Sequence, residues 1–166
     1  MKKILAATLM VLAGAAPAKA QDDPFVTFRV LKPELALEMA EAAMAACRSA
    51  GFQVGVTVVD RFGTPQVFVR DRFAGLHVYE TSRRKAWTAV SFRTSTTDLN
   101  TATAPGSSSQ GIRALSEALP LGGGIPVLEG DGSIVAAIGV SGAPSPEEDD
   151  VCAEAGIAAI EDQIAF

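Results

Sequence analysis

Apolar spacing, composition and helix-boundary residues predict three of the chain's α-helices. Residues 33–50 carry one apolar stripe, begin with a proline and are followed by Gly51, which are common helix boundaries. Residues 78–92, rich in alanine, arginine and lysine, predict a second long helix. A third helix is predicted to begin at Pro146, because Ser145 is a good N-cap and Glu148 follows three residues later, as in a capping box.

Between these helices the pattern predicts two β-hairpins. In the first, the alternating apolar residues of 53–60 lead through a tight turn into a returning strand at 65–70. In the second, strands at 124–129 and 133–142 flank a glycine-rich turn. The segment 134–140 is almost entirely apolar, so both faces of this strand should be covered.

The region between the second helix and the second hairpin has no clear period. Residues 94–110 are rich in threonine, serine and alanine, and we predict a surface loop with one helical turn near 98–101. Residues 112–118 predict a short helix. Two hairpins with helices outside them predict an α+β fold with an antiparallel sheet.

The first twenty residues are typical of a secretory signal peptide. Two lysines precede an apolar stretch over 4–16, and Ala18-Lys19-Ala20 fits the small-residue cleavage pattern. This stretch is shorter than the roughly 20 residues that a membrane span needs. We predict cleavage after Ala20, a periplasmic or secreted protein with no membrane span after cleavage, and a single domain over 21–166.

The net charge of the chain bears on which classes of partner it can bind. Loss of three lysines with the signal leaves 11 basic against 19 acidic residues, a net charge of −8. Such an acidic chain is a poor candidate for binding nucleic acid. The only dense basic run, 83–85, is short.

Two cysteines remain, Cys47 and Cys152. Their spacing does not match a zinc site or a Cys-x-x-Cys redox motif. After export they could form a disulfide, or they could be two separate buried thiols. The residues alone leave both possibilities open.

His77, the only histidine, is the first candidate for a metal ligand. It follows the loop 73–76 and opens the helix predicted at 78–92, so it should lie at a loop edge. The alternative is a solvent-facing or capping histidine. Tyr79, the only tyrosine, is a reserve ligand or a packing residue.

Basic side chains near His77 could bind a carboxylate ligand, because guanidinium groups match carboxylates; the alternative is a solvated helix face. These candidates are Arg70, Arg83, Arg84 and Lys85. A hydrolytic triad is not indicated, because the chain has one histidine and Ser141 lacks the Gly-x-Ser-x-Gly frame.

Three further motifs are assigned structural roles. Asp60 is expected to fix the first hairpin through its side-chain oxygen. The acidic run 147–150 is expected to complement the helix dipole rather than to bind a metal. The glycines at 122–124 are expected to allow close approach of backbone or ligand.

Several of these motifs, taken in order, resemble the GlcG/HbpS-like family of small haem-binding and related proteins. They are Val58-Val59-Asp60-Arg61-Phe62-Gly63, Phe68-Val69-Arg70-Asp71, Arg84-Lys85-Ala86-Trp87-Thr88-Ala89, Gly122-Gly123-Gly124-Ile125-Pro126 and Ile138-Gly139-Val140-Ser141-Gly142. The resemblance extends from about Leu35 to Ile160 and includes the C-terminal part of PduO-type cobalamin adenosyltransferases.

The resemblance implies a profilin-like fold, an antiparallel sheet flanked by helices in α/β/α layers. In that fold the first and last helices pack side by side on one face. Cys47 lies late in the first helix and Cys152 early in the last, so the resemblance favours a disulfide over two free thiols.

The resemblance also implies an exported haem-binding or haem-sensing protein that forms homo-oligomers and is not an enzyme. His77 is then the expected ligand of the haem iron, with Tyr79 in reserve. Arg70, Arg83, Arg84 and Lys85 are expected near the propionates. The alternative is an accessory protein or enzyme acting on a small carboxylate or a corrinoid.

Overall fold

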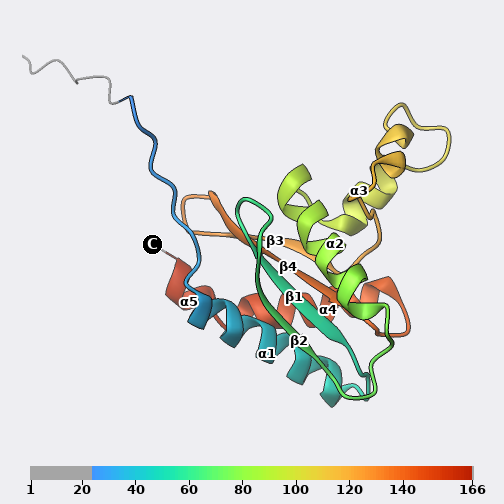
Figure 1. Cartoon of the computed structure of the whole chain (residues 1–166), viewed down its shortest axis with the longest axis horizontal. Helices are drawn as coiled ribbons and strands as arrows, with labels where there is room; N and C mark the ends of the chain where they lie inside the picture. Colours follow the sequence, from blue (N-terminus) through green and yellow to red (C-terminus); the bar gives the residue numbers. More distant parts are fainter. Residues whose placement is uncertain (1–23, 166) are drawn as a thin grey trace, which may run out of the picture.

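The structure, a computed structural model, describes residues 24–165 and consists of one four-stranded antiparallel sheet between two layers of helices (Figure 1). The predicted signal peptide lies outside the described residues. The strands are β1 (Gly55–Asp60), β2 (Pro65–Arg70), β3 (Gly124–Leu128) and β4 (Ile134–Ser141), in the spatial order β2-β1-β4-β3. The helices are α1 (Pro33–Ser49), α2 (Val78–Phe92), α3 (Thr96–Ala102), the 3₁₀ helix η1 (Gln110–Ala114), α4 (Pro146–Ala158) and α5 (Glu161–Ile164).

The central strand β4 explains the layering. Its side chains alternate, so Ile138 and Val140 pack with α1 and α4, whereas Ala137 packs with α2 on the other face. Gly139 also faces α2, and a Cβ atom there would lie 2.0 Å from the Ser82 carbonyl oxygen. Both faces of this apolar strand are therefore covered, as its sequence predicts (Figure 1).

The first and last long helices, α1 and α4, lie side by side on one face of the sheet (Figure 1). Cys47 of α1 and Cys152 of α4 form a disulfide, with Cα atoms 5.4 Å apart. The bridge expected from the resemblance is therefore confirmed, and it joins positions 105 residues apart in the chain.

The segment between α2 and β3 differs from its prediction. The predicted single turn is the seven-residue helix α3, capped by the Ser95 side chain, which accepts a hydrogen bond from the Asp98 amide. Leu99 of α3 is buried and anchors this helix to the rest of the fold. The polar composition of the segment gives no indication of this contact. The short helix predicted at 112–118 is the 3₁₀ turn η1, which ends before Leu115.

Tight turns and close contacts follow the sequence more directly. Asp60 Oδ1 accepts hydrogen bonds from the amides of Phe62 and Thr64, which fixes the β1–β2 turn as predicted. A Cβ atom at Gly124 would lie 2.5 Å from the Lys85 carbonyl oxygen, so the glycine run does permit close backbone approach.

Within residues 24–165, none of the helices has the length and apolar character that a membrane crossing requires.

Candidate functional site

An open pocket of about 350 Å³ lies where the start of α2 meets the connection from β4 to α4. It is lined by residues that include His77, Thr81, Lys85, Ser141 and Asp149. Two of the candidates from the sequence, His77 and Lys85, therefore share one pocket, at its rim and its floor respectively.

His77 occupies the N-cap position of α2 and is exposed. Its imidazole lies over Gly75, where a Cβ atom would be 2.6 Å from the ring carbon Cε1. Its backbone carbonyl accepts a hydrogen bond from the Thr81 amide, but among residues 24–165 its ring has no hydrogen-bond or ion-pair partner. The ring nitrogens are thus available to an external ligand, such as a metal ion.

Three large apolar or aromatic side chains near His77 in the sequence are exposed. Phe73 is 81% exposed and Leu76 is 92% exposed, although both are large and apolar. Tyr79, half-exposed, packs edge-on against Phe68 with ring centroids 4.8 Å apart. Large exposed apolar side chains are typical of surfaces that bind an apolar ligand or a protein partner.

A buried ion pair closes the floor of the pocket. The Lys85 ammonium donates to Asp149 Oδ2 at 2.7 Å and to the Val140 carbonyl at 2.9 Å. The other carboxylate oxygen of Asp149 accepts from the amide of Ala143. Burial raises the pKa of the Asp149 carboxyl, and the charge and hydrogen bond of Lys85 only partly oppose this rise.

Two hydroxyl groups complete the polar lining of the pocket, and a second carboxylate lies next to it in the chain. Thr81 donates to the Ser141 hydroxyl at 2.7 Å across the pocket, which links α2 to the end of β4. Asp150, beside Asp149, accepts hydrogen bonds from the Gly123 amide and the Thr97 hydroxyl. Each of these side chains therefore has a hydrogen-bond partner within the protein.

The candidate arginines hold different positions. Arg83 pairs with Glu80 and Glu117, and it lowers the pKa of the Glu80 carboxyl through a hydrogen bond. Arg84 donates to the backbone carbonyls of Glu117 and Ala118. Both guanidiniums therefore tie α2 to the segment that precedes β3.

Arg70 is the remaining candidate, at the exposed end of β2. In the part of the chain that the structure describes, its side chain has no hydrogen bond or ion pair, so it keeps its donors for a ligand. The structure therefore brings together His77 and Lys85 in one pocket, whereas Tyr79 packs against Phe68 outside its lining. Of the four basic candidates, Arg70 alone has no partner among the described residues.

Sequence reasoning missed Asp149 as the partner of Lys85. The run 147–150 does stand at the N-terminus of α4, and Ser145 caps that helix by accepting from the Glu148 amide. Of this run, Asp149 is buried, because α4 packs by that face against the end of the sheet. The four-residue spacing of Asp149 from Ser145 gave the only signal, since it places both on one helix face.

A single imidazole limits the kind of metal chemistry available. No group of three or more His, Cys, Asp or Glu side chains within residues 24–165 could hold a metal ion. A lone imidazole can supply one ligand to a metal.

Comparisons with known proteins agree in both sequence and structure. The family model described as "Haem degrading protein HbpS-like" matches residues 31–158. The chain is 34% identical over 125 residues to the corrinoid adenosyltransferase PduO of Salmonella typhimurium, covering 74% of this chain and 37% of that protein. It thus spans little more than a third of that relative. An uncharacterised 15.0 kDa protein of Citrobacter freundii is 32% identical, with 86% of its length covered.

Solved structures extend the similarity to the whole fold. A double mutant of Streptomyces reticuli HbpS superposes with a TM-score of 0.78 at 37% identity, over 89% of this chain and 98% of that one. The PduOC–haem complex has a TM-score of 0.72 at 32% identity, over 79% and 95% of the two chains.

Proposed function

Because the chain belongs to the HbpS-like haem-degrading protein family, we propose that it binds haem beside His77, in a binding or sensing role rather than a catalytic one. The observation that carries this proposal is the exposed His77 ring, free of partners among the described residues. The haem in the solved PduOC complex supports the choice of ligand.

The residues around His77 fit the two halves of a haem. An imidazole nitrogen suits the iron, and the exposed Phe73 and Leu76 suit the apolar macrocycle. Arg70 keeps its guanidinium free for a propionate, whereas Arg83 already carries two carboxylate partners. Tyr79 is held beside Phe68 and is the reserve ligand.

Bound haem would supply an iron centre with reversible redox and ligand-binding chemistry. The protein's part is to offer one nitrogen ligand, to shield the macrocycle and to balance the propionate charge. The buried Lys85–Asp149 pair keeps the wall behind His77 fixed, because it ties α2 to α4.

A haem titration tests the binding itself. Ferric haem added to the purified protein should give a saturable Soret band, with one haem per His77-bearing chain. Gel filtration of the mixture should carry haem with the protein. Haem that elutes only in the free fraction would contradict the proposal.

We also propose that the protein assembles through the apolar surface beside His77. Side chains as exposed as Leu76 are stabilised when a second copy covers them. Sedimentation should show a homo-oligomer that Leu76→Glu weakens. Leu115→Glu is the matched control, because Leu115 is 52% exposed but lies far along the chain in the segment before β3. Equal oligomers for both variants would contradict this assembly.

We also propose, from the N-terminal sequence, that the protein is exported. The N-terminal pattern of basic, apolar and small residues predicts removal of residues 1–20 and a periplasmic or secreted protein. The intact mass of the exported protein should match a chain that begins at Gln21. Retention of Met1 to Ala20 would contradict it.

A further inference from the structure

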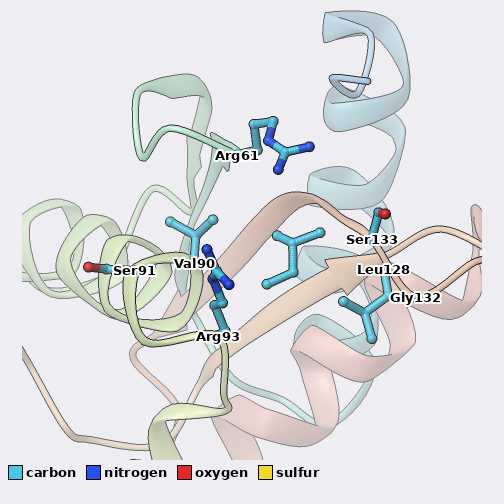
Figure 2. A pocket seen from close by; sticks show the side chains of 8 residues that line it. Arg61, Val90, Ser91, Arg93, Leu128, Gly132 and Ser133 are labelled. Carbon is cyan, nitrogen blue, oxygen red and sulfur yellow. The ribbon is translucent and has the colours of Figure 1, made fainter. Parts of the chain in front are cut away.

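A second cavity lies at the opposite end of α2 from His77. It is an open groove of about 620 Å³ between three parts of the chain. These are the β1–β2 turn with Arg61, the end of α2 with Val90 and Arg93, and the β3–β4 hairpin with Leu128 (Figure 2). His77 caps the start of α2 and Arg93 caps its end, so the groove is separate from the haem proposal.

Arg61 is held in place before any ligand arrives. Its guanidinium carbon lies 4.3 Å from the centroid of the Phe28 ring, a cation–π contact that leaves its N–H donors free. Phe28 in turn packs edge-on against Phe62 of the same turn. The Asp60 carboxylate, which precedes Arg61, is turned toward backbone amides.

Arg93 is held by an unusual backbone conformation. It has φ 57° and ψ 37°, in the left-handed region, and is the only residue other than glycine with positive φ within residues 24–165. Side chains with a Cβ atom seldom adopt this conformation, which is common for glycine at helix ends. Over the same residues the Arg93 side chain has no hydrogen bond or ion pair.

The two guanidiniums face the same space without a carboxylate between them. Figure 2 shows Arg61 above the groove and Arg93 below it. Among the described residues no Asp or Glu lines the groove, although the whole chain has a net charge of −5. The nearby Asp131 carboxylate accepts from the Ser133 amide instead. Two like charges facing one cavity repel each other, and an anion between them removes that repulsion.

We propose that this groove binds a small dianion between Arg61 and Arg93. Guanidinium groups donate paired N–H bonds to carboxylate or phosphate oxygens, so two of them suit two carboxylates or one phosphate. Val90, Leu128 and Ile134 give the groove an apolar wall, which suits the short hydrocarbon of a dicarboxylate. A cation at the C-terminal end of α2 is stabilised by the helix dipole, which explains the presence of Arg93 without a ligand. The dipole does not explain why Arg61 lines the same groove.

The fluorescence of Trp87 can report ligand binding in the groove. Trp87 is the only tryptophan, and its ring packs against Gly63 in the turn that carries Arg61. Succinate, inorganic phosphate and acetate would be titrated at constant ionic strength while tryptophan fluorescence and calorimetry are followed. We expect succinate or phosphate to saturate with a millimolar or lower Kd, and acetate to bind at least about tenfold more weakly. Succinate binding alone identifies a dicarboxylate, and phosphate binding alone identifies a phosphate.

Arg93→Gly is the sharpest variant, because glycine suits the backbone conformation and should leave the Tm unchanged or raised. It should nonetheless weaken dianion binding by at least about tenfold, as should Arg61→Gln. The matched control is Arg72→Gln, an exposed arginine outside the groove. No saturable binding, equal binding of acetate and dianions, or an unchanged affinity in Arg93→Gly would overturn the proposal.

Discussion

The ammonium of Lys85 lies 2.7 Å from a carboxylate oxygen of Asp149, and both side chains are buried. Lys85 belongs to α2 and Asp149 to α4, which cover opposite faces of the sheet. The pair therefore joins the two helical layers at the end of β4. It does so beneath the pocket whose rim carries His77.

Replacing Lys85 with methionine should destabilise the protein by roughly 3 kcal/mol near pH 7, because the Asp149 carboxylate is left buried without its cation. Urea unfolding measures this free energy. Lys32→Met is the matched control, since Lys32 is exposed, and it should change the free energy of unfolding by less than about 0.5 kcal/mol.

The same variant should change the pH dependence of stability in a defined direction. The pKa of Asp149 is raised in the folded protein, so protonation favours folding, and this contribution is lost as pH rises through the folded pKa. Without Lys85 the pKa should rise further, so Lys85→Met should recover stability relative to wild type as the pH is lowered toward about 4. A deficit that stays constant between neutral and acidic pH would refute this electrostatic account.

The disulfide should be a large contributor to stability. It closes a loop with a sequence separation of 105 residues, for which loop entropy gives roughly 4–5 kcal/mol. Denaturant unfolding of the oxidised protein should therefore shift to lower midpoints on reduction. A Cys47→Ala, Cys152→Ala double variant should match the reduced protein and be insensitive to reductant. An oxidised protein with the midpoint of this variant would contradict the prediction.

Gly139 should tolerate no side chain. A Cβ atom there would meet the Ser82 carbonyl oxygen at 2.0 Å, so Gly139→Ala must push α2 away from β4. Overpacking of this kind costs about 3 kcal/mol or more. Gly111→Ala is the control, because nothing lies within 4 Å of its added Cβ atom. Thermal unfolding compares the two, and equal Tm values would contradict the close contact.

Local patterns were enough to predict most of the fold. The alternation of β1, the apolar run of β4 and the Ser145 cap each report a local preference, and each lies where it was predicted. The length of α3 exceeds the single turn predicted, because only two of its residues, Thr96 and Leu99, are buried. Two buried positions are too few to give a visible helical period.

The site depends on contacts that no local pattern reveals. Lys85 and Arg83 look alike in the sequence, yet Lys85 is buried against a residue 64 positions away and Arg83 stays at the surface. The groove of Arg61 and Arg93 joins a turn to a helix end across the fold. Such pairings follow from the packing of α2 on the sheet, so the sequence supplied candidates but not their partners.

The most direct test of the account is a haem titration of three proteins followed by the Soret band: wild type, His77→Ala and Tyr79→Phe. Because His77 offers the free imidazole, His77→Ala should shift the Soret maximum and weaken binding by at least about tenfold, or 1.4 kcal/mol. Tyr79→Phe, which keeps the ring contact with Phe68, should retain the wild-type spectrum and affinity. An unchanged Soret position and affinity in His77→Ala would contradict the assignment of His77 as the iron ligand.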